Sequence, residues 1–102
     1  MINPVSNVQI NLSPKFNSQL IKAPTEIKIA FDESLELFKE DPLKPHPNLR
    51  SHSLREKYTG FSSIDVTEDW RALFKIRQTK LKTVITFHIL GTHTQLYEQN
   101  MF

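Results

Sequence analysis

The 102-residue chain contains no cysteine and only two glycines. Without cysteine it can form neither disulfides nor thiolate metal sites. Two isolated glycines cannot build a glycine-rich phosphate-binding loop, so nucleotide hydrolysis is disfavoured. No stretch approaches the roughly 18 apolar residues of a membrane span, and residues Met1 to Val5 lack the basic and apolar regions of a signal peptide. These absences favour a cytoplasmic protein that has no membrane partner.

The length and composition predict one globular domain over residues 1–102, because domains of about 100–150 residues are the most common. A hydrophobic content of 38% and an aromatic content of 10% argue against disorder. The net charge is only +2, but acids crowd the segment from Thr25 to Asp41 and cations predominate from Arg50 to Lys82. This distribution is compatible with a polyanion that binds on one side, although charge alone slightly favours an ordinary solvated surface.

The first half of the chain predicts one strand and two helices. Polar and apolar residues alternate over Val8–Leu12, as in a short strand. Ser13-Pro14 supplies an N-cap and a first-turn proline for a short helix. Apolar residues at helical spacing predict an amphipathic helix from Thr25 to Lys39, and the three prolines between Asp41 and Pro47 end it.

The second half predicts strands and a short final helix. The strands are expected at His52–Lys57, Phe61–Val66, Trp70–Arg77 and Leu81–Leu90. Gly91 ends the last strand, and Thr92 can cap a helix that carries His93 and Tyr97. The predicted class is therefore α+β, with two N-terminal helices packed on an antiparallel sheet of about four to five strands and a short C-terminal helix.

Side chains that can transfer protons, bind phosphate or stack on bases recur through this second half, in an order that packing alone does not require. They are His52, Asp65, Asp69, Trp70, Arg71, His93 and Tyr97, with the cations Arg55 and Lys57 nearby. Histidine, with an ordinary pKa of about 6.5, can donate or accept a proton near neutral pH, and lysine or arginine can hold a phosphate. This combination suits the cleavage of an RNA strand. Because the histidine spacings match no familiar zinc site, we expect that cleavage to need no metal or other cofactor.

The ordered motifs L-x-x-x-Y-x-G-F, D-W-R-A-L-F-K-I and F-H-I-L-G-T-H-x-x-L-Y resemble the RelE/ParE superfamily of bacterial type II toxins, and most of all its YafQ-like mRNA interferases. The resemblance spans nearly the whole chain. It places His52, Asp69, Trp70 and His93 at positions that carry function in that branch, and Tyr97 at a commonly aromatic one. Three residues depart from the branch: Asp65 stands where a further catalytic histidine is usual, Ser53 replaces a frequent proline, and Glu56 a frequent glycine. Arg71 is commoner in HigB-like and RelE-like members.

The resemblance implies an endoribonuclease that cleaves mRNA in the ribosomal A site and is held inactive by a cognate antitoxin. In the family's reaction the ribose 2′-hydroxyl attacks the adjacent phosphodiester, which leaves a 2′,3′-cyclic phosphate and a free 5′-hydroxyl. We expect His52 as base and His93 as acid, with Asp69 orienting an imidazole or replacing the base. The other roles are a further catalytic group at Asp65, phosphate contacts by Lys57, Arg71 and Arg55, and base stacking by Trp70 and Tyr97.

Structural roles compete with several of these assignments. His93 can simply cap or pack at a helix start, and Trp70 can be a core residue that shares a face with Ala72, Phe74 and Ile76. Tyr97 can cover the sheet edge, and Asp65 can be a solvated strand residue. Two other functions stay open as well: a ParE-like inhibitor of DNA gyrase, and a catalytically silent RelE-fold binding protein.

Overall fold

The computed structural model describes residues 8–44, 47–54 and 58–97. In chain order the elements are β1 (Val8–Leu12), α1 (Pro14–Lys22), α2 (Thr25–Glu40), the 3-10 helix η2 (Pro47–Leu49), β2 (His52–Ser53), β3 (Ser62–Asp65), β4 (Trp70–Gln78), β5 (Thr83–Thr92) and α3 (His93–Tyr97). The α+β class, the two N-terminal helices and the short C-terminal helix are confirmed. No helix in these ranges is long and apolar enough to cross a bilayer.

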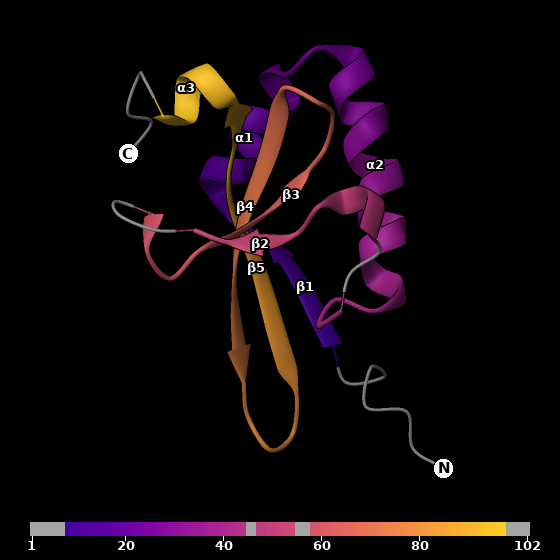
Figure 1. The fold of residues 1–102 in the computed structure, drawn as a ribbon, viewed down its shortest axis with the longest axis vertical. Coiled ribbons are helices and arrows are strands. Elements are labelled where there is room, and N and C mark those ends of the chain that lie inside the picture. The colour runs from indigo at the N-terminus through magenta and orange to yellow at the C-terminus, as the bar shows by residue number, and fades with distance from the viewer. Residues whose placement is uncertain (1–7, 45–46, 55–57, 98–102) are drawn as a thin grey trace.

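The sheet has five strands in the order β1-β5-β4-β3-β2 (Figure 1). Neighbouring strands from β2 to β5 run antiparallel, as expected. The expectation of a wholly antiparallel sheet is wrong in one respect, because β1 pairs parallel with β5. Parallel neighbours need a long crossover connection, and here α1, α2 and strands β2 to β4 all lie between the two strands in sequence.

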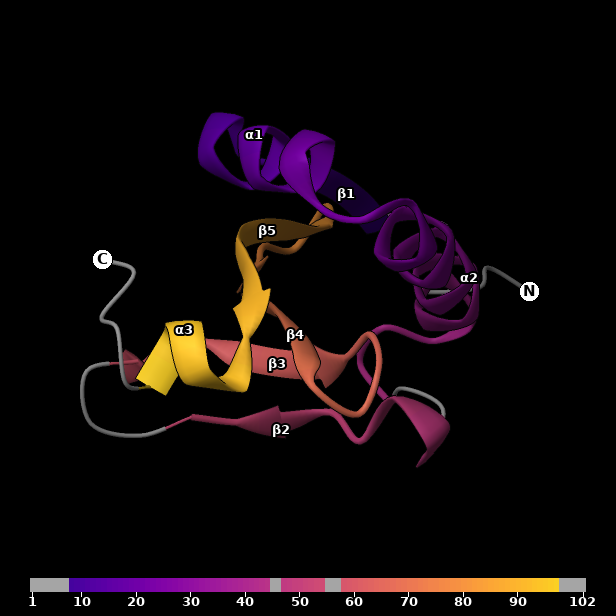
Figure 2. The same cartoon turned by 90° about the horizontal axis from the view of Figure 1, so that it is seen from above.

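Helices cover both faces of the twisted sheet at the end where β4 begins and β5 ends. Helices α1 and α2 lie on one side, whereas α3 lies on the other (Figure 2). The first core, between α1, α2 and the sheet, is built around phenylalanines. The ring of Phe87 lies 5.2–5.6 Å, centroid to centroid, from the rings of Phe16, Phe31, Phe38 and Phe74. Such tilted and edge-to-face pairs add stabilisation beyond the area that they bury.

The second core lies under α3 and contains Tyr58, Phe61, Leu73, Ile89 and Leu96. Consecutive strand residues point to opposite faces, so Leu73 packs on this side while its neighbours on β4 pack on the first core. The pairing of β4 with β5 shifts register between Leu73 and Phe74. Both faces of the sheet are therefore buried where β4 pairs with β5, and the second core packs α3 against the sheet.

The predicted boundaries differ from the observed ones mainly at strand ends. Of the predicted strand His52–Lys57, only His52 and Ser53 are in β2, and residues 55–57 lie outside the described residues. The last strand begins at Thr83 and ends at Thr92, two residues later than expected. Residues 79–82 form its preceding turn instead, where the Thr79 backbone N–H donates to the Lys82 carbonyl at 2.9 Å.

Candidate functional site

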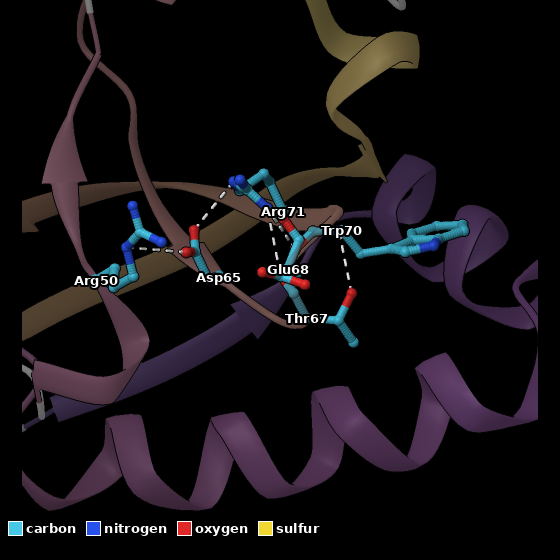
Figure 3. Close-up of polar contacts among 6 residues, drawn as sticks. All are labelled: Arg50, Asp65, Thr67, Glu68, Trp70 and Arg71. Atoms are coloured by element: carbon cyan, nitrogen blue, oxygen red, sulfur yellow. Dashed lines mark hydrogen bonds and ion pairs between the residues drawn. The ribbon is translucent and has the colours of Figure 1, made fainter.

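An ion pair between Asp65 and Arg71 lies at the end of β3 and the start of β4. The two residues are direct partners in the antiparallel register, and Arg71 Nε lies 3.0 Å from Asp65 Oδ1. Arg50 Nε approaches the other carboxylate oxygen at 3.5 Å (Figure 3). Only 10% of the Asp65 side chain and 16% of the Arg71 side chain are exposed. These contacts make Asp65 an anchor that holds a guanidinium in place; its expected part in proton transfer stays a prediction.

Arg71 also forms hydrogen bonds with the turn that precedes it. Its Nη1 donates to the carbonyl oxygens of Glu68 at 2.7 Å and Thr67 at 3.2 Å. The backbone N–H of Trp70 in turn donates to Thr67 Oγ1 at 3.1 Å. Arg71 Nη2 has no hydrogen-bond partner within residues 8–44, 47–54 and 58–97. Among the described residues the Nη2 edge of the guanidinium is thus unpaired, and the expected binding of an anion by Arg71 stays a prediction.

The same turn is joined to the start of α3 through the main chain. The backbone N–H of His93 donates to the carbonyl oxygen of Asp69 at 2.9 Å. The Asp69 side chain is exposed, and its carboxylate forms no hydrogen bond or ion pair with a residue in the described ranges. The structure thus places Asp69 beside His93 by a backbone bond, and its expected role of orienting an imidazole or replacing the base stays a prediction.

Helix α3 is short but held at both ends. Thr92 and Gln95 form a capping box: the Gln95 N–H donates to Thr92 Oγ1 at 3.1 Å, and the Thr92 N–H donates to Gln95 Oε1 at 2.9 Å. At the other end the buried hydroxyl of Tyr58 donates to the carbonyl oxygen of Leu96. A five-residue helix is marginal by itself, so these bonds fix the direction in which its side chains point.

Replacing Thr92 by alanine should therefore loosen α3. We expect the free energy of unfolding to fall by about 1 kcal/mol, the usual cost of removing an N-cap side chain. Urea denaturation followed by circular dichroism measures the loss. Thr94→Ala is the matched control, because Thr94 is exposed in the same helix and outside the capping box. Equal losses in the two variants would show that the cap contributes nothing.

His93 and Tyr97 lie one helical turn apart on the outer side of α3. Their ring centroids are 4.6 Å apart, and Tyr97 also meets the ring of Tyr58 edge-on at 5.5 Å. Burial raises the pKa of Tyr97 above its ordinary value; the charge of Arg71 lowers that pKa and the charge of Asp65 raises it. The phenol therefore lies within the field of the ion pair. Since 37% of Tyr97 is exposed, its ring remains accessible to a ligand.

Four of the expected site residues thus meet at one end of the sheet: Asp65, Arg71, His93 and Tyr97. The backbone of His52 pairs with Ser63, two residues before Asp65 on β3, which brings β2 alongside this group. The side chain of His52 and the whole of Arg55 and Lys57 lie outside the described residues. The roles assigned to those three residues remain predictions.

Trp70 is separated from this group. It is half-buried against the first core, and its ring points away from Arg71 and Asp65 (Figure 3), as alternation along β4 requires. The expected sharing of a core face is confirmed for Ala72 and Phe74 but is wrong for Ile76, which is 39% exposed. If Trp70 stacks on a base, that base is not the one beside Tyr97.

Sequence reasoning missed two residues that shape the site, Tyr58 and Arg50. Tyr58 is part of the L-x-x-x-Y-x-G-F motif, which could have identified it as a fixed point in the fold. Arg50 has a left-handed backbone conformation, with φ of +50°, that no local pattern indicates. The ring of His88, on β5, lies 5.6 Å from the ring of Phe61, centroid to centroid. Burial, and secondarily the charge of Lys75, lower its pKa.

Comparison with solved structures identifies the fold. YafQ from Escherichia coli strain BL21(DE3) superposes with a TM-score of 0.70 at 21% identity, covering 87% of this chain and 97% of that one. The YoeB/ParE toxin from Agrobacterium tumefaciens gives 0.66 at 9% identity, covering 83% and 98%. The toxin–antitoxin complex RelBE2 from Mycobacterium tuberculosis gives 0.59 at 20% identity, covering 83% and 96%. The chain therefore has the fold of these toxins, as the resemblance implied.

No protein-family model matches the chain, and no curated protein sequence matches it either.

Proposed function

We propose that this chain is the toxin of a type II toxin–antitoxin pair and that it cleaves mRNA on the ribosome. The observation that carries the proposal is the convergence of the Asp65–Arg71 ion pair with His93 and Tyr97 on one end of the sheet. A cation, an imidazole and an accessible aromatic ring are what metal-independent cleavage of a single-stranded RNA needs. The shared fold supports the toxin assignment.

In the proposed mechanism Tyr97 stacks on an unpaired base and thereby fixes the ribose of the cleaved nucleotide. His52 takes the proton from the 2′-hydroxyl, whose oxygen attacks the neighbouring phosphorus. The bond from phosphorus to the 5′-oxygen breaks, and His93 gives that oxygen its proton. The products are a 2′,3′-cyclic phosphate and a 5′-hydroxyl, and the two histidines exchange protonation states. Metal ions and other cofactors take no part.

Arg71 stabilises the charge that develops on the phosphorane through its open Nη2 edge, since Nε and Nη1 are already bonded to protein groups. Asp65 fixes the position of that guanidinium, which limits the reorganisation needed when the phosphate arrives. Lys57 and Arg55 add positive charge from the segment that follows β2. Asp69 lies next to His93 and is the group best placed to adjust the orientation of that imidazole when RNA binds.

The proposed partner outside the ribosome is a cognate antitoxin protein. The structures with this fold include complexes of a toxin with its antitoxin, DinJ–YafQ from E. coli and RelBE2 from M. tuberculosis. An antitoxin that covers the site end of the sheet would block access to His93 and Tyr97, both of which are exposed. We also propose that both proteins act in the cytoplasm, where the translating ribosome is found.

Induced expression of the wild-type chain, followed by mapping of mRNA 5′ ends, tests the proposal. We expect growth arrest, with new 5′-hydroxyl ends at sites inside translated regions within minutes of induction. Those ends should disappear when translation initiation is blocked. Arrest with intact mRNA and halted DNA replication would instead favour a gyrase inhibitor of the ParE type. Binding to ribosomes without either effect would indicate a silent RelE-fold protein.

A further inference from the structure

A cavity of about 200 Å³ lies on the opposite side of β4 from Arg71. It is lined by Gln19, Lys22, Ala23, Trp70, Leu90 and Gln95, which come from α1 and the residue after it, from β4 and β5, and from α3. None of them belongs to the group formed by Asp65, Arg71, His93 and Tyr97, although Gln95 also caps α3. The pockets that hold drug-sized molecules are larger, roughly 300–1,000 Å³. The cavity therefore suits a single planar ring system.

Hydrogen bonds fix both glutamine amides that line this cavity. The backbone N–H of Leu90 donates to Gln19 Oε1 at 2.8 Å, and the backbone N–H of Thr92 donates to Gln95 Oε1 at 2.9 Å. A backbone N–H can only donate, so each side chain must turn its oxygen toward the main chain. What each amide has left is its NH₂ group, which bonds to no described residue.

The side chains around the cavity therefore offer hydrogen-bond donors and two kinds of apolar wall. The donors are the NH₂ groups of Gln19 and Gln95, the ammonium of Lys22 and the indole N–H of Trp70. The apolar walls are the flat ring of Trp70 and the buried side chains of Ala23 and Leu90. A ligand that fits is planar, stacks on an indole and presents acceptors rather than donors at its edge.

We propose that this cavity binds one unstacked nucleobase of the RNA, with guanine preferred over adenine; this inference rests on the proposed function. Guanine presents two adjacent acceptors, O6 and N7, to paired donors, whereas adenine places its N6 amino group there. A phosphate alone fits less well, because it cannot use the ring of Trp70. Since Trp70 and Arg71 are consecutive residues, the cavity lies within reach of a nucleotide close to the one that Tyr97 contacts.

The chain contains a single tryptophan, so its fluorescence reports directly on the cavity. The probes are two RNA hexamers that carry one guanosine or one adenosine among uridines, with 2′-O-methyl riboses that prevent cleavage. We expect saturable quenching, with the guanosine hexamer binding about tenfold more tightly. No ribosome is present, so this binding is measured independently of nuclease activity.

Two substitutions separate the proposed donor role from a structural one. In Gln19→Glu and Gln95→Glu a carboxylate oxygen still accepts from the Leu90 or Thr92 N–H, but the donor becomes an acceptor. We expect the guanine preference to vanish in each variant. Gln78→Glu, at the exposed end of β4, makes the same change in charge and should weaken both hexamers equally while keeping their ratio.

The inference would be overturned if the two hexamers quenched equally or not at all. It would also be overturned if the guanine preference survived in both Gln19→Glu and Gln95→Glu. A chain that binds guanine in this way but leaves mRNA intact keeps the cavity assignment and loses the nuclease assignment. A chain that cleaves mRNA but whose tryptophan fluorescence is quenched by neither hexamer keeps the nuclease assignment and loses the cavity assignment. The two proposals therefore fail by different measurements.

Discussion

His93→Ala is expected to lower ribosome-dependent mRNA cleavage by at least about 100-fold, the lower range of what a positioned acid or base contributes. The imidazole is exposed at the first position of α3, so its removal leaves no cavity in either core. It is also the proposed donor of the proton to the 5′-oxygen, which makes the loss fall on the chemical step. Cleavage is measured as the rate of appearance of 5′-hydroxyl ends on programmed ribosomes.

Thr94→Ala is the matched control for His93→Ala, since it alters the next residue of the same exposed helical turn. It should keep wild-type cleavage within about twofold, as surface changes away from a site usually do little. Circular dichroism should show the same helix content in both variants. His52→Ala is expected to reduce cleavage by a similar factor. Full growth arrest in both histidine variants would rule out the proposed acid–base mechanism while leaving the fold untouched.

Phe87→Ala is expected to lower the free energy of unfolding by about 3–5 kcal/mol. The Phe87 side chain is fully buried and contacts four other phenylalanine rings. Removing the Phe87 ring loses the free energy of its transfer from water into the core. It also leaves a cavity that the four surrounding rings cannot fill. Chemical denaturation measures the change, and Phe87→Leu should give a smaller loss because it keeps part of the apolar volume.

Leu81→Ala controls for a general effect of shortening apolar side chains in the β4–β5 hairpin. Leu81 is 82% exposed, so its truncation should change the free energy of unfolding by less than about 0.5 kcal/mol. Because many domains are stable by only 5–15 kcal/mol, the Phe87→Ala chain will lie near its limit of folding. A loss of less than about 1 kcal/mol for Phe87→Ala would show that the ring cluster is not the centre of the core.

Local patterns predicted the helices and most strands well because their causes are local. Ser13 caps α1 by accepting from the Phe16 N–H at 3.0 Å, as Ser-Pro at a helix start indicates. Apolar spacing gave the buried face of α2, where Ile27, Phe31 and Phe38 are buried. The cap at Thr92 was also predicted correctly. Each of these features is decided within a few residues of chain.

The remaining features depend on how the strands pair. Nothing in Val8–Leu12 indicates a parallel neighbour, because the alternation of side chains is the same in either direction. The ion pair of Asp65 with Arg71 is close in sequence, but it depends on the register between two neighbouring strands, which no local pattern gives. The separation of Trp70 from Arg71 follows from strand alternation and could have been predicted. The resemblance alone, which places Trp70 among the functional residues, pointed the other way.

The parallel pairing of β1 with β5 has a consequence for how the chain folds as it is made. Val8 pairs with Thr83, and Phe16 and Phe31 close on Phe87. During synthesis the first strand and both long helices thus leave the exit tunnel well before the strand that completes their core, and pairing so distant in sequence forms slowly. His93 and Tyr97 follow directly after that strand. A polypeptide that still lacks β5 and α3 therefore has neither a closed first core nor an assembled site.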